Sequence, residues 1–159
     1  MISPEIEFAW NTNNAVNQVL VQHLTPVMLE AGTPGGGYSV AQHLAHMVEC
    51  TKSWGMELEA GELKDLPDLY SNYDNDTGMF DAEMNLERIR AVMTQTRDLV
   101  LETAKKAVGT GKLPHSSPAQ FLMHMAMHDA HHRGQILLAL KTNGFALPEE
   151  RAFWIPLRA

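Results

Sequence analysis

Four histidines in the stretch 124–132 (His124, His128, His131 and His132) are the side chains of this sequence best placed to do chemistry. At about 100° per residue, His128 and His132 lie about 40° apart on one helix face, the spacing at which two imidazoles reach one ion. Two neutral imidazoles together in a core are costly unless something bridges them, so the pair predicts a shared metal ion. His124 and His131 flank this face, and each is interpreted as a group that supports the ligands or as a surface residue.

The helix that carries these histidines must turn them into a core. Ser117 and Pro118, with Gln120 at the third position, are typical of a helix start, and Asn143-Gly144 is typical of a left-handed stop. Apolar residues project within about 80° of His128 and predict that its face is buried; they are Phe121, Met125, Ile136 and Ala139.

Three further segments have the apolar periodicity of helices, whereas few runs show the alternation of a strand. The predicted helices run from Ser3-Pro4 to about Leu24, from Ser39 to about Gly61, and from about Met79 to Val108.

These elements predict an all-α protein, with residues 1–159 forming a single domain. We expect an antiparallel four-helix bundle, whose core can hold a site built from facing helices. The tail from residue 145 is expected to wrap over the bundle or to pack on a partner subunit.

The segment 39–61 must supply a third ligand, and the helical wheel leaves two candidates open. His43 lies nearer the middle of the apolar stripe of this segment, while His46 lies at its edge. Periodicity therefore mildly prefers His43.

Composition narrows the kinds of partner and ligand. The net charge is −7 with only 12 lysines and arginines, which argues against a nucleic-acid partner. No window approaches the roughly 18 apolar residues of a membrane span. The first twenty residues lack the pattern of an export signal, so we expect a soluble cytoplasmic protein.

The sequence has one cysteine, Cys50, so a metal site must depend on histidine or carboxylate. Cys50 lies one turn beyond His46. It is interpreted mainly as buried filler, with a fourth ligand or a nucleophile as the alternative.

Two stretches, "SVAQHLAHMVECTKSW" and "HDAHHRGQI", resemble the DinB-like (YfiT-like) family of metalloenzymes. In that family the ligand of the second helix lies seven residues after a capping Ser or Thr and eight before an aromatic residue. Here those positions are Ser39, His46 and Trp54. The resemblance therefore selects His46 over His43.

The second family motif, His-x-x-x-His-Arg-Gly-Gln, maps without a gap onto residues 128–135. The resemblance implies a bundle with a three-histidine site made by His46, His128 and His132, usually in a homodimer. It also implies thiol transferases and thiol-dependent isomerases as relatives, in which a low-molecular-weight thiol such as bacillithiol or mycothiol coordinates as thiolate.

Three histidines leave open positions on a zinc, nickel or ferrous ion, where a small-molecule substrate or water can bind. Gln135 projects about 20° from His128, so it is a candidate for a catalytic role through a hydrogen bond to a ligand imidazole or to substrate, or else it ties down the helix. Arg133 is interpreted as a surface or interface residue. A thiol-dependent S-transferase is the leading hypothesis; the alternatives are a metal-dependent hydrolase and a non-enzymatic metal-binding stress-response or dimerisation module.

Two competing patterns are set aside. "HDAHH" places Asp129 where a zinc protease has its general base, but Asp129 projects about 100° from His128. The loop 72–83 carries acidic residues at calcium-loop spacing, but Thr77 replaces the required glycine.

Overall fold

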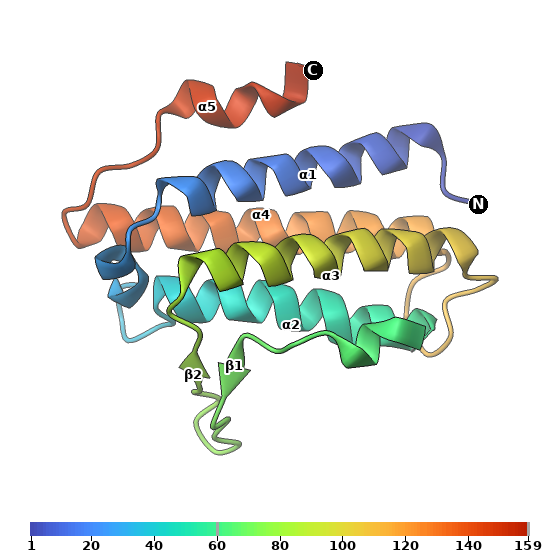
Figure 1. The fold of residues 1–159 in the computed structure, drawn as a ribbon, viewed down its shortest axis with the longest axis horizontal. Coiled ribbons are helices and arrows are strands. Elements are labelled where there is room, and N and C mark those ends of the chain that lie inside the picture. Colours follow the sequence, from blue (N-terminus) through green and yellow to red (C-terminus); the bar gives the residue numbers. More distant parts are fainter. Residues whose placement is uncertain (60, 159) are drawn as a thin grey trace.

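The computed structural model of the protein describes residues 1–59 and 61–158. Four long helices lie side by side: α1 (Pro4–His23), α2 (Val40–Leu58), α3 (Leu86–Lys106) and α4 (Pro118–Thr142) (Figure 1). A 3₁₀ turn (Pro26–Glu30) follows α1. The prediction of an all-α bundle is confirmed.

Chain direction alternates from α1 to α2 and from α3 to α4, whereas α2 and α3 run in the same direction (Figure 1). The connection between α2 and α3 is long enough to return to the end where α2 begins. It contains a 3₁₀ turn (Gly61–Asp65) and a hairpin of two short antiparallel strands, β1 (Tyr70–Ser71) and β2 (Asp81–Ala82). The side chain of Gln42, near the start of α2, donates to the Phe80 carbonyl shortly before α3 and so ties the hairpin to that end.

Local capping explains where the helices begin. The Ser39 hydroxyl accepts from the Gln42 backbone and the Gln42 side chain accepts from the Ser39 backbone, which is the predicted capping box. Ser117 caps α4 in the predicted place, where its hydroxyl accepts from the Gln120 backbone.

The predicted start of the third helix near Met79 is wrong. Residues 81–82 pair with residues 70–71 in the hairpin, and α3 begins only at Leu86. The Asn85 side chain caps it by accepting from the Arg88 backbone. The residues that the apolar spacing assigned to the first turns of the helix therefore lie in and around a strand pair instead.

The other boundaries differ less from the predictions. Helix α1 ends at His23 with Leu24 as its cap, α2 ends at Leu58, and α3 ends at Lys106. Helix α4 ends at Thr142 with Asn143 as its cap and Gly144 at a positive φ of 78°, as the Asn-Gly stop predicts.

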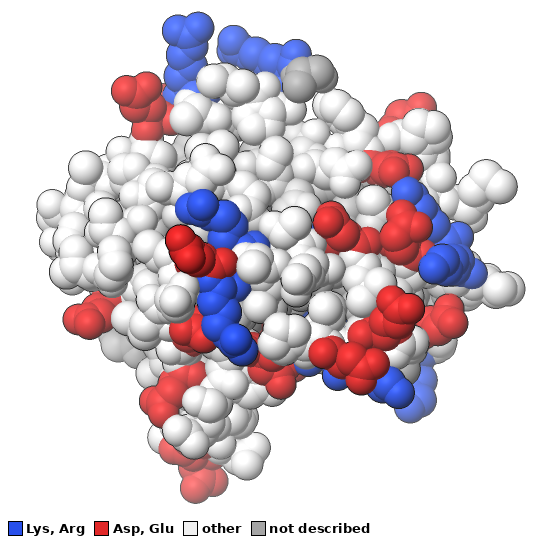
Figure 2. Space-filling model, viewed as in Figure 1, with Lys and Arg blue, Asp and Glu red and all other residues white. Residues whose placement is uncertain are grey.

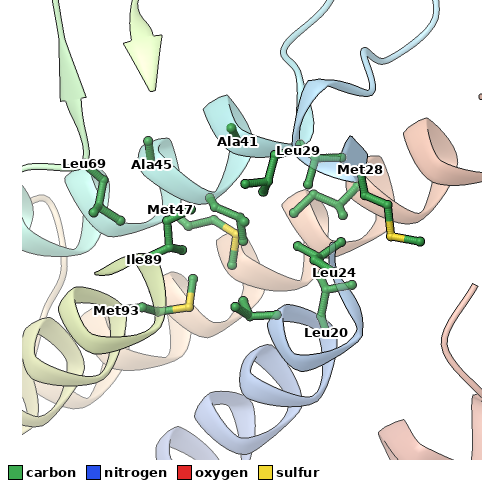
Figure 3. Packing of buried hydrophobic residues seen from close by; sticks show 14 of the residues in the cluster. Leu20, Leu24, Met28, Leu29, Ala41, Ala45, Met47, Leu69, Ile89 and Met93 are labelled. Carbon is green, nitrogen blue, oxygen red and sulfur yellow. The ribbon is translucent and has the colours of Figure 1, made fainter. Parts of the chain in front are cut away.

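The core consists of two clusters of buried apolar side chains. The larger one joins the start of α2, the start of α3 and the ends of α1 and α4, and its packing is shown in Figure 3. The smaller one lies around Trp10, Phe121 and Met125. The predicted inward face of α4 is confirmed, since Phe121, Met125, Ile136 and Ala139 are all buried. Both clusters hold α4 in place independently of any bound ion.

A buried polar network joins α1 to α4. Asn13 and Asn17 each donate to the Asp129 carboxylate at 2.7 Å, and the Arg133 guanidinium donates to the amide oxygens of both asparagines. Arg133 is half-buried and bonded within the chain, so it is not a free surface residue, and the alternative that it lies at an interface stays a prediction. The Asp129 carboxylate is turned toward α1, which agrees with setting the zinc-protease pattern aside.

The tail returns over the bundle. Its short helix α5 (Glu150–Trp154) lies beside α1, and Phe153 packs against the larger core cluster (Figure 1). A 3₁₀ turn (Pro156–Arg158) follows α5. None of the described helices is long and apolar enough to cross a membrane. On the face drawn in Figure 2, lysine and arginine side chains lie among aspartate and glutamate side chains.

Candidate metal centre

Three histidines from two helices converge in the bundle. His46 comes from α2, and His128 and His132 come from successive turns of α4. Each offers a ligand atom, and these atoms all lie within 4.8 Å of one another. The Nε2 atoms of His128 and His132 are 3.1 Å apart. The structure therefore brings together the three residues that the family resemblance selects, and their nitrogen donors fit a divalent ion such as zinc.

The protonation of these histidines suits metal binding. Burial, and then the neighbouring imidazoles, lower the pKa of His128 to about 4 and that of His132 to about 3. Burial also lowers the pKa of His46. Near pH 7 the three side chains are therefore neutral, which is the form of imidazole that binds a metal.

His43 contacts the three-histidine group through His132. Its Nδ1 is 2.9 Å from Nδ1 of His132, on the opposite side of the His132 ring from His128. If His132 offers Nε2 to an ion, its Nδ1 carries the hydrogen and donates to His43, which fixes the tautomer and the ring orientation. The helical wheel preferred His43 because it lies nearer the middle of the apolar stripe. In the structure that position buries His43 and makes it a partner of His132.

The remaining histidines of α4 point elsewhere. His124 is exposed and lies 2.8 Å from a ring nitrogen of His115, beside Trp54. His131 is exposed, with its ring centroid 5.2 Å from that of His132. His124 is thus separated from the three-histidine group, whereas the His131 ring contacts that of His132 without offering a ligand atom to the group.

Gln135 is half-buried, and among residues 1–59 and 61–158 no hydrogen bond joins it to an imidazole of the group. Its catalytic role stays a prediction.

Cys50 is half-buried, with Sγ 3.4 Å from Nε2 of His46. It lies outside the group whose ligand atoms are mutually close. Burial, followed by the nearby carboxylates of Glu49 and Asp129, raises the pKa of its thiol to about 11. The Cys50 side chain is therefore protonated near pH 7 in the absence of an ion, as expected for a buried cysteine.

A cavity of about 300 Å³ opens beside His46. One wall is α2, and the other is the β1–β2 hairpin with its aromatic side chains; the lining residues are Ala45, His46, Glu49, Cys50, Tyr70, Tyr73 and Phe80. The sequence analysis missed this wall, because it weighed the loop 72–83 only as a calcium site and assigned residues from about Met79 to a helix. The closely spaced aromatic residues, Tyr70, Tyr73 and Phe80, were the signal that could have revealed the wall.

The polar side chains of the acidic loop at the hairpin tip form hydrogen bonds within the hairpin. The Asp74 carboxylate accepts from the Asp76 backbone and the Thr77 hydroxyl, and the Asn72 amide donates to Asp81. These contacts account for the loop without a calcium ion.

Comparison with known protein families gives a match over most of the chain: the model described as the DinB family matches residues 6–153. Comparison with curated proteins finds no match.

Proposed function

Since the chain belongs to the DinB family, we propose that it is a metal-dependent enzyme that activates a small-molecule thiol, most simply an S-transferase. The observation that supports this most directly is the convergence of His46, His128 and His132 beside a cavity large enough for a small molecule. Three protein ligands leave a position for substrate, whereas a structural zinc site is closed by four.

Separate residues of this chain would bind the ion, orient a ligand ring and contact the substrate. His46, His128 and His132 would hold a zinc, nickel or ferrous ion, and His43 would keep the His132 ring in its ligand orientation. Such an ion, when bound, lowers the pKa of a thiol or water that shares its coordination shell. The aromatic hairpin forms one wall of the cavity, and Gln135 is proposed to orient the substrate.

The thiol step is tested with protein in which cobalt(II) replaces the native ion. Addition of 2-mercaptoethanol is expected to produce a thiolate-to-cobalt charge-transfer absorption that saturates with thiol concentration. His128→Ala serves as the control and is expected to abolish the band. Cobalt-loaded protein that binds no thiol at any concentration would favour the hydrolase alternative, in which water occupies the open position.

We also propose that the protein forms a homodimer through α1 and α4. One cavity lies in the groove between these helices and has a mostly apolar lining from both. A second cavity shares Ala9 and Ala130 with it and continues beneath the tail, where Phe153 and Trp154 of α5 also line it. Met127 lines the first of these cavities, which no residue of α5 lines, and is 70% exposed, so this end of the groove is open to a second copy.

Met127→Lys should convert the dimer to a monomer, because it places a charge in the apolar contact. Sedimentation velocity at several protein concentrations measures the change. Met84→Lys, at an exposed methionine outside the groove, should leave the dimer intact. A wild-type protein that sediments as a monomer would exclude this interface.

A further inference from the structure

The cavity beside His46 contains one carboxylate that the proposed metal site does not use. Glu49 lines the cavity one turn after His46 on α2 and is half-buried. Its carboxylate lies outside the three-histidine group. Glu49 is therefore placed to contact whatever molecule reaches the site.

Among the described residues no salt bridge compensates the charge of Glu49. The lysine of α2, Lys52, is committed elsewhere: its ammonium donates to the Asp68 carboxylate at 2.6 Å and to the Leu66 carbonyl at 2.6 Å. Burial, and then the charge of Asp68, raise the pKa of Glu49. The opposite effects of Lys52 and Ser53 are smaller, so the pKa lies above its ordinary value. A positive charge brought into the cavity would relieve this uncompensated burial.

The other wall of the cavity is aromatic. The rings of Tyr70 and Phe80 meet edge to face with centroids 5.7 Å apart, and those of Tyr73 and Phe80 stack at 6.2 Å. Glu49 and Tyr70 line the same cavity, and the charge of Glu49 is the largest cause of the raised pKa of Tyr70. Aromatic faces beside a carboxylate are a usual setting for a bound ammonium group.

The chain segment that forms the aromatic wall of the cavity is rich in acidic residues. The segment 65–87 contains no lysine or arginine and seven acidic residues: Asp65, Asp68, Asp74, Asp76, Asp81, Glu83 and Glu87. Asp68 and Glu83 form salt bridges with Lys52 and Arg88, and the other five form none among the described residues. This segment includes the hairpin that projects from the bundle in Figure 1. An acidic approach to the cavity concentrates cations and repels anions.

We infer that the cavity binds an ammonium group, primary or N-methylated, of the molecule that reaches the three-histidine site, with Glu49 as its counter-ion and Tyr70, Tyr73 and Phe80 as its aromatic wall. A volume of about 300 Å³ limits this molecule to a small one. The inference rests on the proposed function only for the reacting end of the molecule, because recognition of the ammonium end requires no metal.

The test compares choline with 3,3-dimethylbutan-1-ol, which has the same shape without the charge. A quaternary ammonium has no lone pair and cannot coordinate a metal through nitrogen, so the difference between the two reports on the cavity alone. We expect calorimetry on the purified protein to give choline an affinity about tenfold higher than that of the alcohol. Glu49→Gln should bring the ratio close to one, and Glu57→Gln, an exposed position on the same helix with the same change in charge, should preserve it.

Equal affinities in the wild-type protein, or a preference that survives Glu49→Gln, would overturn the inference. Elemental analysis of Glu49→Gln should show the metal content of the wild type, and loss of the metal would make Glu49 a ligand and also overturn it. A choline preference in protein whose cobalt form binds no thiol would support the ammonium subsite while the proposed thiol chemistry fails.

Discussion

Replacing His132 by alanine is expected to weaken metal binding by more than about 100-fold while leaving the helical content unchanged. Loss of a residue that only supports a ligand costs roughly 10- to 100-fold in metal affinity, and loss of a direct ligand should exceed that. The fold should persist because the apolar clusters around Leu20 and Phe121 hold the bundle without an ion. Elemental analysis after dialysis measures the metal, and circular dichroism measures the helices.

Alanine variants of the other histidines are expected to differ in how much metal affinity they lose. His46→Ala and His128→Ala should match His132→Ala, and His43→Ala should cost only about 10- to 100-fold, since His43 contacts His132 rather than the ion position. His124→Ala, at an exposed position on the same helix whose imidazole contacts His115 and Trp54, should change nothing. Stoichiometric metal in both the His128 and His132 variants would refute the site, and a larger loss in His43→Ala than in His46→Ala would exchange their roles.

Asp129→Ala is expected to lower the free energy of unfolding by about 3–5 kcal/mol, because it removes the acceptor of a buried charged network. Asp129 is 2% exposed and accepts from Asn13 and Asn17, and the charge of Arg97 opposes the rise that burial causes in its pKa. Without the carboxylate, both amides lose a partner and the buried Arg97 loses a counter-charge.

Urea denaturation followed by circular dichroism measures this loss. Asp98→Ala is the matched control, since Asp98 is exposed and its replacement should change stability by no more than about 0.5 kcal/mol. A loss below about 1 kcal/mol for Asp129→Ala would show that the network contributes specificity of packing rather than stability.

The sequence by itself determined α4 almost completely. Capping residues act within one turn, so Ser117, Gln120 and the Asn143-Gly144 pair marked its ends. The spacing of His128 and His132 placed both on one face for a similar reason: helical geometry relates residues four positions apart. Local rules also predicted the helical bundle, because each apolar stripe requires a partner.

Only the tertiary structure decided the rest. The start of α3 depends on strand pairing between residues 70–71 and 81–82, which no local pattern contains. The positions of His43 and His46 relative to His132 depend on how α2 is rotated against α4, since both lie near the same stripe. The burial of Asp129 against α1 and the aromatic wall beside Glu49 likewise join residues distant in the chain. A sequence pattern determines which side chains share one face of a helix. The packing of several elements determines which side chains from elsewhere in the chain contact that face.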